Sequence, residues 1–178
     1  MAVSRWTIDP AHTVVEFAVR HMMIATVKGT FSGIQGTIEA DPEDLTTARA
    51  EVTIDVNSIN TREPQRDEHL RSPDFFDAAN HPTITFRSRS VTRTGEREYR
   101  MVGDLTIRGV TREVELRVTV AGQARDPWGN ERFGFSVEGK INRKDFGLTW
   151  NTVLETGGVL VGDEVRINID VEAVKQAA

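Results

Sequence analysis

Cysteine is absent from this sequence of 178 residues, and that absence excludes several kinds of site at once. Without cysteine the chain can form no disulfide framework, zinc–thiolate site, iron–sulfur cluster or thiol nucleophile. No apolar run approaches the roughly 18 residues that a membrane-spanning helix requires. The glycine-rich dinucleotide motif, the phosphate-binding loop and Gly-x-Ser-x-Gly are missing as well. We therefore expect no cofactor and no membrane span.

Basic residues are outnumbered, with 22 lysines and arginines against 27 acidic residues and a net charge of −5. This balance disfavours general affinity for nucleic acid or for an anionic bilayer, because both repel a negative protein at long range. The content of 38% apolar and 28% charged residues is that of a soluble domain. We expect a single domain over residues 1–178. The first ten residues lack the apolar segment of a signal peptide, which predicts a cytoplasmic location.

Apolar and polar residues alternate along most of the chain. In Val14–His21, for example, Val15, Phe17 and Val19 share one parity and Glu16 and Arg20 the other. Successive side chains of a strand point to opposite faces, so this pattern predicts strands with one dry and one wet face. The expected strands cover residues 14–21, 26–40, 50–56, 84–89, 101–108, 113–120, 133–141, 146–150 and 165–171.

Short turns join several of these strands, at residues 93–96, 108–111 and 126–130, which predicts an antiparallel meander. About eight strands with one dry face each must either pack as a sandwich or close as a barrel. Long strands and interior glycines favour the closed barrel, because glycine lets a curved strand bend. These glycines are Gly29, Gly33, Gly36, Gly103 and Gly139.

A helical insertion at about residues 60–80 interrupts the strand pattern. Asn60-Thr61-Arg62-Glu63 is typical of a helix start, and Ser72-Pro73-Asp74 indicates a second one. Leu70, Phe75 and Phe76 give these short helices an apolar side. We expect one or two short helices to cap one end of the barrel.

The four histidines form neither a His-x-His nor a His-x-x-x-His pair, so we expect no metal site. His21 has the inward parity of Val15, Phe17 and Val19. Three interpretations stay open for it: a hydrogen-bonded histidine at a strand end, a polar contact for a ligand head group, and a general base. We expect no catalytic residues, and we predict that His21 contacts the head group of a ligand.

The interior of an eight-stranded barrel either fills with side chains or holds one small ligand. Strands of about ten residues at roughly 3.3 Å each would enclose a bore some 30 Å long, which suits an elongated apolar molecule. A packed core is the alternative. The residues expected to line such a bore are Val15, Phe17, Val19, Phe31, Ile54, Phe75, Phe76, Phe86, Leu105, Ile107, Phe133, Phe135, Phe146 and Ile167.

An ordered set of motifs from Trp6 to Asp170 resembles the YceI-like polyisoprenoid-binding family. It comprises residues 6–13 (WTIDPAHT), 27–31 (VKGTF), 52–55 (VTID), 58–61 (SINT), 66–72 (RDEHLRS), 74–77 (DFFD), 103–111 (GDLTIRGVT), 143–147 (RKDFG) and 161–165 (VGDEV). The resemblance implies an extended antiparallel barrel of the lipocalin-like type.

The resemblance also implies a binding protein whose bore holds a long-chain polyisoprenoid, such as a prenyl diphosphate or an isoprenoid quinone. A carrier or sequestering role follows, although many members of the family are exported to the periplasm. The family offers no established catalytic residues to carry over. Its recurring polar positions correspond here to Asp9, His12, His21, Asp67, His69 and Asp74, and two roles stay open for them: a structural role and contact with the ligand's head group.

Two alternatives to a lipid-binding protein remain at this point. One is a hydrolase of an isoprenoid diphosphate, which would need His21 beside a carboxylate at one end of the bore. The other is a ligand-free stress or interaction scaffold, which would need an interior filled by side chains. The expected partner is a polyisoprenoid lipid and not nucleic acid, and an exposed strand edge could pair two chains as a homodimer.

Overall fold

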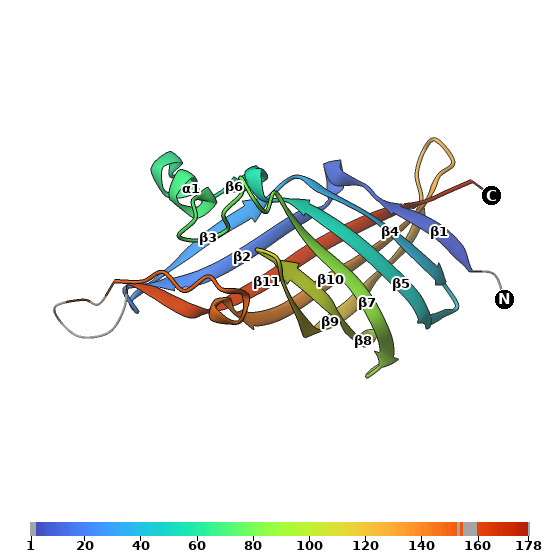
Figure 1. The fold of residues 1–178 in the computed structure, drawn as a ribbon. Helices are drawn as coiled ribbons and strands as arrows, with labels where there is room; N and C mark the ends of the chain where they lie inside the picture. The colour runs from blue at the N-terminus through green and yellow to red at the C-terminus, as the bar shows by residue number, and fades with distance from the viewer. Residues whose placement is uncertain (1–2, 153, 155–159, 178) are drawn as a thin grey trace.

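The structure is a computed structural model, and it describes residues 3–152, 154 and 160–177 (Figure 1). Strands dominate it, as the alternating sequence predicts. They are β1 (Ser4–Ile8), β2 (Val14–His21), β3 (Ala25–Phe31), β4 (Ile34–Asp41), β5 (Asp44–Asp55), β6 (Ile59–Asn60), β7 (Thr83–Arg93), β8 (Glu98–Ile107), β9 (Val110–Arg125), β10 (Glu131–Asn142) and β11 (Val161–Lys175).

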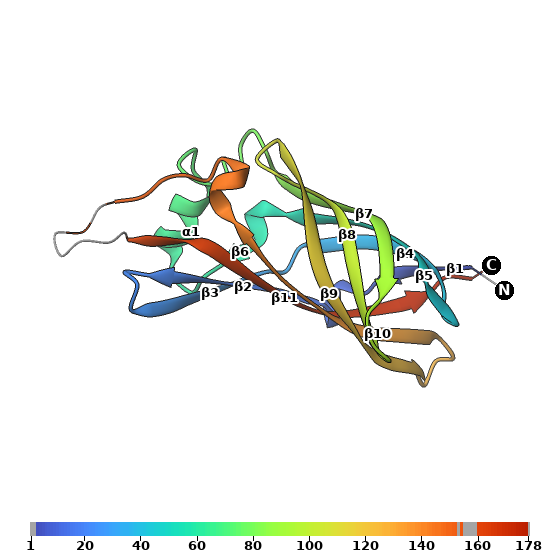
Figure 2. The same cartoon turned by 90° about the horizontal axis from the view of Figure 1, so that it is seen from below.

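The sheet closes on itself as an eight-stranded antiparallel barrel. The ring runs β1-β4-β5-β7-β8-β9-β10-β11 and returns to β1 through a β1–β11 pairing. β11 is long enough to pair with β10 on one side and with both β1 and β2 on the other. β2 and β3 prolong the wall beyond β1 and β4, so the barrel is elongated in both views (Figures 1 and 2). Of the two architectures considered from the sequence, the closed barrel is therefore confirmed and the sandwich is wrong.

The predicted turns join β7 to β8, β8 to β9 and β9 to β10. The tightest of them consists of Arg108 and Gly109, whose φ angles are 52° and 73°. Positive φ at both central residues matches the right-handed twist of the flanking strands, and glycine adopts it at little cost.

Three details of the predicted strands are wrong. β1 was not expected, and the stretch 26–40 is split into β3 and β4 around Ser32 and Gly33. Residues 146–150 form no strand, because Arg143–Phe146 is a 3₁₀ helix that ends on Gly147 at φ 79°. The Asn142 side chain accepts a hydrogen bond from the backbone N–H of Lys144, which starts this helix.

The insertion contains one α-helix, α1 (Pro64–Arg71), with Glu63 as its N-cap and proline in its first turn. The second expected helix, at Ser72-Pro73-Asp74, does not form. The N–H groups of Phe76 and Ala78 instead donate back to the carbonyls of Leu70 and Arg71, so this segment winds into turns against the end of α1. No helix among the described residues has the length and apolar character needed to span a membrane.

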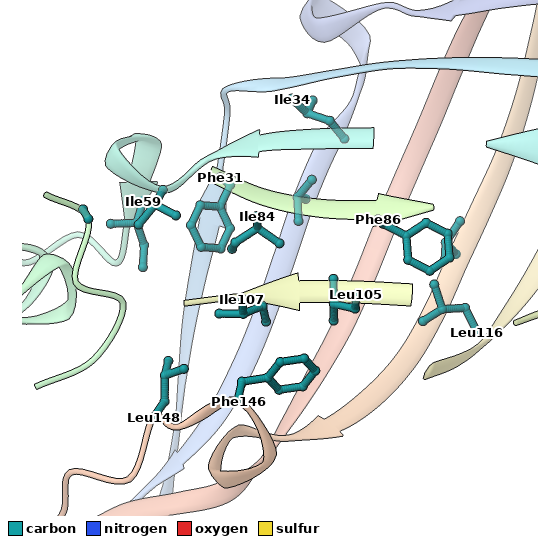
Figure 3. Close-up of a cluster of buried hydrophobic side chains, with 14 of the residues drawn as sticks. Phe31, Ile34, Ile59, Ile84, Phe86, Leu105, Ile107, Leu116, Phe146 and Leu148 are labelled. Atoms are coloured by element: carbon teal, nitrogen blue, oxygen red, sulfur yellow. The ribbon is translucent and has the colours of Figure 1, made fainter. Parts of the chain in front are cut away.

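The core lies inside the barrel, on the parity that the sequence predicts (Figure 3). Its larger cluster gathers inward side chains from most strands, including Phe86, Leu105 and Leu116. A smaller cluster of Trp6, Phe133 and Ala173 lies at the end that holds the chain termini. The buried side chains therefore form two clusters at different positions along the barrel.

Gly103 is a close-packed position where β8 pairs with β7. A Cβ atom added there would lie 2.5 Å from both the Arg87 carbonyl oxygen and the Phe86 ring. Overpacking of this kind costs about 1–3 kcal/mol, so we expect Gly103→Ala to lower the melting temperature by several degrees, at about 2–4 °C per kcal/mol. Gly134→Ala is the matched control, because a Cβ atom added at Gly134 would lie no closer than 3.6 Å to any neighbouring atom. Equal melting temperatures for the two variants would contradict this account.

Candidate functional site

The interior of the barrel holds a cavity of about 410 Å³. A volume of this size falls within the roughly 300–1,000 Å³ range of small-molecule sites. All fourteen residues predicted to line a bore contribute to its wall, and so does His21. The expectation of inward parity is therefore confirmed, whereas occupation by a ligand remains a prediction. An interior completely filled by side chains is not what the structure shows.

Aromatic rings shape both ends of the cavity. At the end near the termini, Trp6 packs edge-on against Phe133 with ring centroids 5.8 Å apart. At the end near α1, the Phe31 ring lies 5.4 Å from that of Phe17 and 5.9 Å from that of Phe76. Between them the wall is made largely of valine, leucine and isoleucine, so the cavity favours an apolar chain.

The polar side chains of the lining gather at one end, beside α1. We call this group the polar mouth, and it consists of Arg20, His21, Thr61, Arg66, His69 and Arg143. Arg20 is solvent-exposed and also lines the cavity, so the cavity reaches the surface here. The other hydroxyl in the lining, that of Tyr99, lies near the β7–β8 turn. The cavity is thus apolar along its length and polar at one end.

Thr61 is held from two sides by consecutive residues of α1. The Asp67 carboxylate accepts hydrogen bonds from the Thr61 backbone N–H, at 2.8 Å, and from its hydroxyl. The Arg66 guanidinium donates to the Thr61 hydroxyl and carbonyl oxygens, at 2.8 and 2.6 Å. Because its Nη1 group is not used in these bonds, Arg66 retains donors that can face a ligand.

His69 joins the polar mouth to the aromatic wall. Its Nε2 lies 3.0 Å from an Asp74 carboxylate oxygen, and its ring packs edge-on against Phe75 and Trp150, at 5.1 and 4.7 Å. This arrangement orients the imidazole and places its other nitrogen away from Asp74. Asp67 and His69 were recognised in the sequence among the family's recurring polar positions, but the sequence did not predict that α1 places Arg66 beside His69 in the cavity lining.

Arg143 is buried, with a side chain only 4% exposed. Its guanidinium donates to the carbonyls of Leu148, Trp150, Val161 and Gly162 at 2.6 to 3.3 Å. Burial lowers the pKa of Arg143, and Asp163 at 3.7 Å opposes that effect. This side chain therefore satisfies the carbonyls of an irregular segment and fixes the mouth, and few of its donors remain for a ligand.

His21 is the last residue of β2 and is half-buried at the polar mouth. Within the described residues no carboxylate lies within hydrogen-bond distance of its ring. A hydrolase built on His21 would need such a partner to orient and activate the imidazole. His21 thus lacks such a partner among the described residues, and its contact with a ligand head group stays a prediction.

Asp9, His12 and Glu172 form a cluster at the junction of β1 and β2, and their ligand atoms lie within 4.8 Å of one another. Arg132 is already bound there, with its guanidinium 2.9 Å from Asp9 and 2.8 Å from Asp126. His12 Nδ1 contacts the same Asp9 oxygen at 2.7 Å. Because a guanidinium neutralises the carboxylates, we interpret the cluster as an ion-pair network that ties the strands together.

These features define the class of protein: an eight-stranded β-barrel that encloses an apolar cavity with one polar end. A family model described as the YceI-like domain matches residues 6–173. A UPF0312 protein of Staphylococcus aureus (strain N315) is 40% identical over 171 residues, which are 96% of this chain and 97% of that protein. The chain belongs to the YceI-like family.

Solved structures agree with this assignment. BcnA of Burkholderia cenocepacia superposes with a TM-score of 0.81 at 27% identity, covering 93% of this chain and 98% of that one. The Campylobacter jejuni YCEI protein gives 0.75 at 35% identity, covering 89% and 90%. A Saccharophagus degradans domain described as polyisoprenoid-binding gives 0.70 at 14% identity, covering 98% and 100%, and shows the shared fold.

The Arg132 network predicts a loss of stability in acid. The hydrogen bond from Arg132 holds the pKa of Asp126 at about 2, against an ordinary 3.8, and hydrogen bonds from His12 and Arg132 lower the pKa of Asp9. A carboxyl with a lowered pKa stabilises the fold above its unfolded-state pKa, and this contribution disappears as the pH falls toward the folded-state value. We expect the melting temperature to drop between about pH 4 and pH 2.

The test is a series of thermal melts from pH 7 to pH 2. Asp126→Asn should melt lower than the wild type at pH 7 and should show a shallower decline below pH 4. Asp145→Asn is the control, because Asp145 is exposed and makes no side-chain hydrogen bond within the described part of the chain. If the melting temperatures of the wild type and of Asp126→Asn fell in parallel with pH, Asp126 would not contribute to the loss of stability in acid.

Proposed function

We propose that this protein binds a long-chain polyisoprenoid lipid, with the prenyl chain in the barrel cavity and the head group at the polar mouth. The observation that carries the proposal is the distribution of polarity in one continuous cavity. Its wall from Trp6 to Phe31 is apolar apart from the Tyr99 hydroxyl, and its cationic side chains are confined to one end. An amphipathic lipid with a single polar end has the same distribution.

The apolar wall supplies affinity through area rather than through any single contact. Burial of apolar surface contributes about 25 cal/mol per Å², before the cost of ordering the ligand is subtracted. Many valines, leucines and phenylalanines therefore contribute a little each. The barrel is closed by backbone hydrogen bonds, so the cavity exists before the ligand enters.

The head group is a diphosphate or a quinone under this proposal. A diphosphate needs several charge-assisted donors, and Arg66 retains such donors beside the cavity. A quinone needs a neutral donor, which His21 can provide. The role that follows is that of a carrier or sequestering protein, and the description of the Saccharophagus domain as polyisoprenoid-binding supports the same class of ligand.

A charge placed in the wall should abolish loading. Phe135 lines the cavity, so Phe135→Asp would put an unpaired carboxylate in apolar surroundings and should lower the amount of bound isoprenoid about tenfold or more. Mass spectrometry of an organic extract from the purified protein measures the bound lipid. The wild type is expected to carry, or to take up when offered, a prenyl diphosphate or an isoprenoid quinone.

Asn168→Asp is the matched control, because Asn168 is an exposed outward residue of the adjacent strand β11. It should load like the wild type. Phe135→Trp adds bulk without charge and is expected to fold and to bind less lipid, so it covers the case in which Phe135→Asp fails to fold. Full loading of a folded Phe135→Asp, or no loading of the wild type by either lipid, would overturn the proposal.

The two head groups should respond differently to substitutions at the mouth. We expect Arg66→Gln to weaken binding of a prenyl diphosphate about tenfold, since a charge-assisted hydrogen bond is lost, and to leave quinone binding unchanged. His21→Ala should weaken quinone binding more than diphosphate binding. Fluorescence titration with both lipids measures these affinities.

Arg62→Gln is the control for Arg66→Gln, because Arg62 is exposed and does not line the cavity. Quinone binding by Arg66→Gln reports on its folding in the same experiment. Equal weakening of both lipids by Arg66→Gln would show a structural role for this side chain, and the head-group assignment would then be wrong.

A further inference from the structure

Three consecutive apolar side chains are exposed at the turn between β2 and β3. Met22, Met23 and Ile24 are 40%, 54% and 77% exposed. We call these three residues the β2–β3 tip. Single exposed apolar residues are normal, whereas a contiguous group on a soluble protein marks an interaction surface.

The backbone of this turn would suit other residues better. The Ile24 N–H donates to the His21 carbonyl at 3.1 Å, and the two residues between them, Met22 and Met23, have φ angles of 53° and 59°. Turns with positive φ at both central positions favour asparagine and glycine, because a bulky side chain is strained there. Two methionines in this conformation are therefore not explained by the needs of the turn.

The tip lies at the polar mouth. In both views the β2–β3 turn lies at the end of the barrel that carries α1 (Figures 1 and 2). His21, the residue before the tip, lines the cavity. The Met22 N–H donates to the Leu160 carbonyl at 2.8 Å, and the Arg20 guanidinium donates to the Met23 carbonyl at 2.9 Å. The tip is thus a braced projection beside the opening of the cavity.

We propose that the β2–β3 tip inserts into the surface of a lipid bilayer and places the polar mouth against it. This inference rests on the proposed function, because a long-chain isoprenoid is dissolved in a bilayer and not in water. The tip is convex and short, so its side chains can enter the acyl boundary without a complementary groove. Arg20 lies beside it with donors left for a lipid phosphate.

Apolar insertion, and not long-range charge, carries the docking under this proposal. The net charge of −5 repels an anionic surface, so the relevant partner is a zwitterionic bilayer. We expect the wild type to float with phosphatidylcholine vesicles in a density gradient, with no isoprenoid present. Binding should persist at high salt, because apolar burial is not screened by ions.

The sharpest variant is Met22→Asn with Met23→Gly, which removes two tip side chains and supplies the residues that the turn favours. We expect its melting temperature to be at least as high as that of the wild type, while vesicle binding falls about tenfold. Ile24→Ser should weaken binding in the same direction. A loss of binding together with a maintained melting temperature cannot be caused by unfolding.

Trp128→Ser is the matched control, because Trp128 is 81% exposed in the β9–β10 turn near the chain termini. It should float like the wild type. The inference is overturned if the wild type does not float, if the Met22→Asn/Met23→Gly variant floats equally well, or if only Trp128→Ser loses binding.

Loading from detergent-dispersed isoprenoid, without vesicles, separates this inference from the proposed function. The tip variant should load normally from detergent but more slowly than the wild type from vesicles. Tip-dependent flotation of a protein that never loads would leave docking in place and overturn the proposed function. Normal loading of a protein that does not float would leave the proposed function in place and overturn the docking inference.

Discussion

Closure of the sheet through β11 is the constraint on which the rest of the structure depends. β11 pairs with β10 along Glu164–Val174 and with both β1 and β2 on its other side, so one strand joins the two ends of the meander. An open sheet with the same alternating sequence would have to bury its dry face against another layer. Closure buries that face against itself, and the space left at the centre becomes a cavity with a wall of inward side chains.

At the polar mouth, where the barrel is open, backbone groups need hydrogen-bond partners other than neighbouring strands. Irregular backbone at the mouth leaves carbonyl groups without strand partners, and a buried carbonyl must be satisfied. Arg143 donates from a single side chain to the carbonyls of Leu148 and Trp150 in this irregular backbone, and to those of Val161 and Gly162 at the start of β11. At Thr61, Arg66 donates to the backbone carbonyl and the Asp67 carboxylate accepts from the backbone N–H. The groups that make this end polar are therefore also the groups that hold it in shape.

The sequence predicted the barrel wall well because strand parity is a local property. Alternation alone placed residues such as Phe17 and Leu105 inside, and the cavity lining confirms them. Of the residues at the mouth, His21 was predicted from the sequence, and His69 was recognised there among the family's recurring polar positions. Arg66 and Arg143 were not predicted, because these side chains come to line one cavity only through the tertiary fold. The second helix at Ser72 was wrong because serine and proline also suit the turns that end α1. β1 was missed because five residues give too short a pattern.

Binding by a closed apolar wall has a consequence for selectivity. No residue of the wall can recognise one isoprene unit of a chain over the next, since all present the same apolar surface. Selectivity must then come from the two ends. If a prenyl chain occupies the cavity as proposed, the Trp6–Phe133 pair lies at the end of the barrel near the chain termini. The polar mouth would hold the head group at the opposite end. Under this proposal the distance between the two ends, rather than any single contact, would distinguish one isoprenoid length from another.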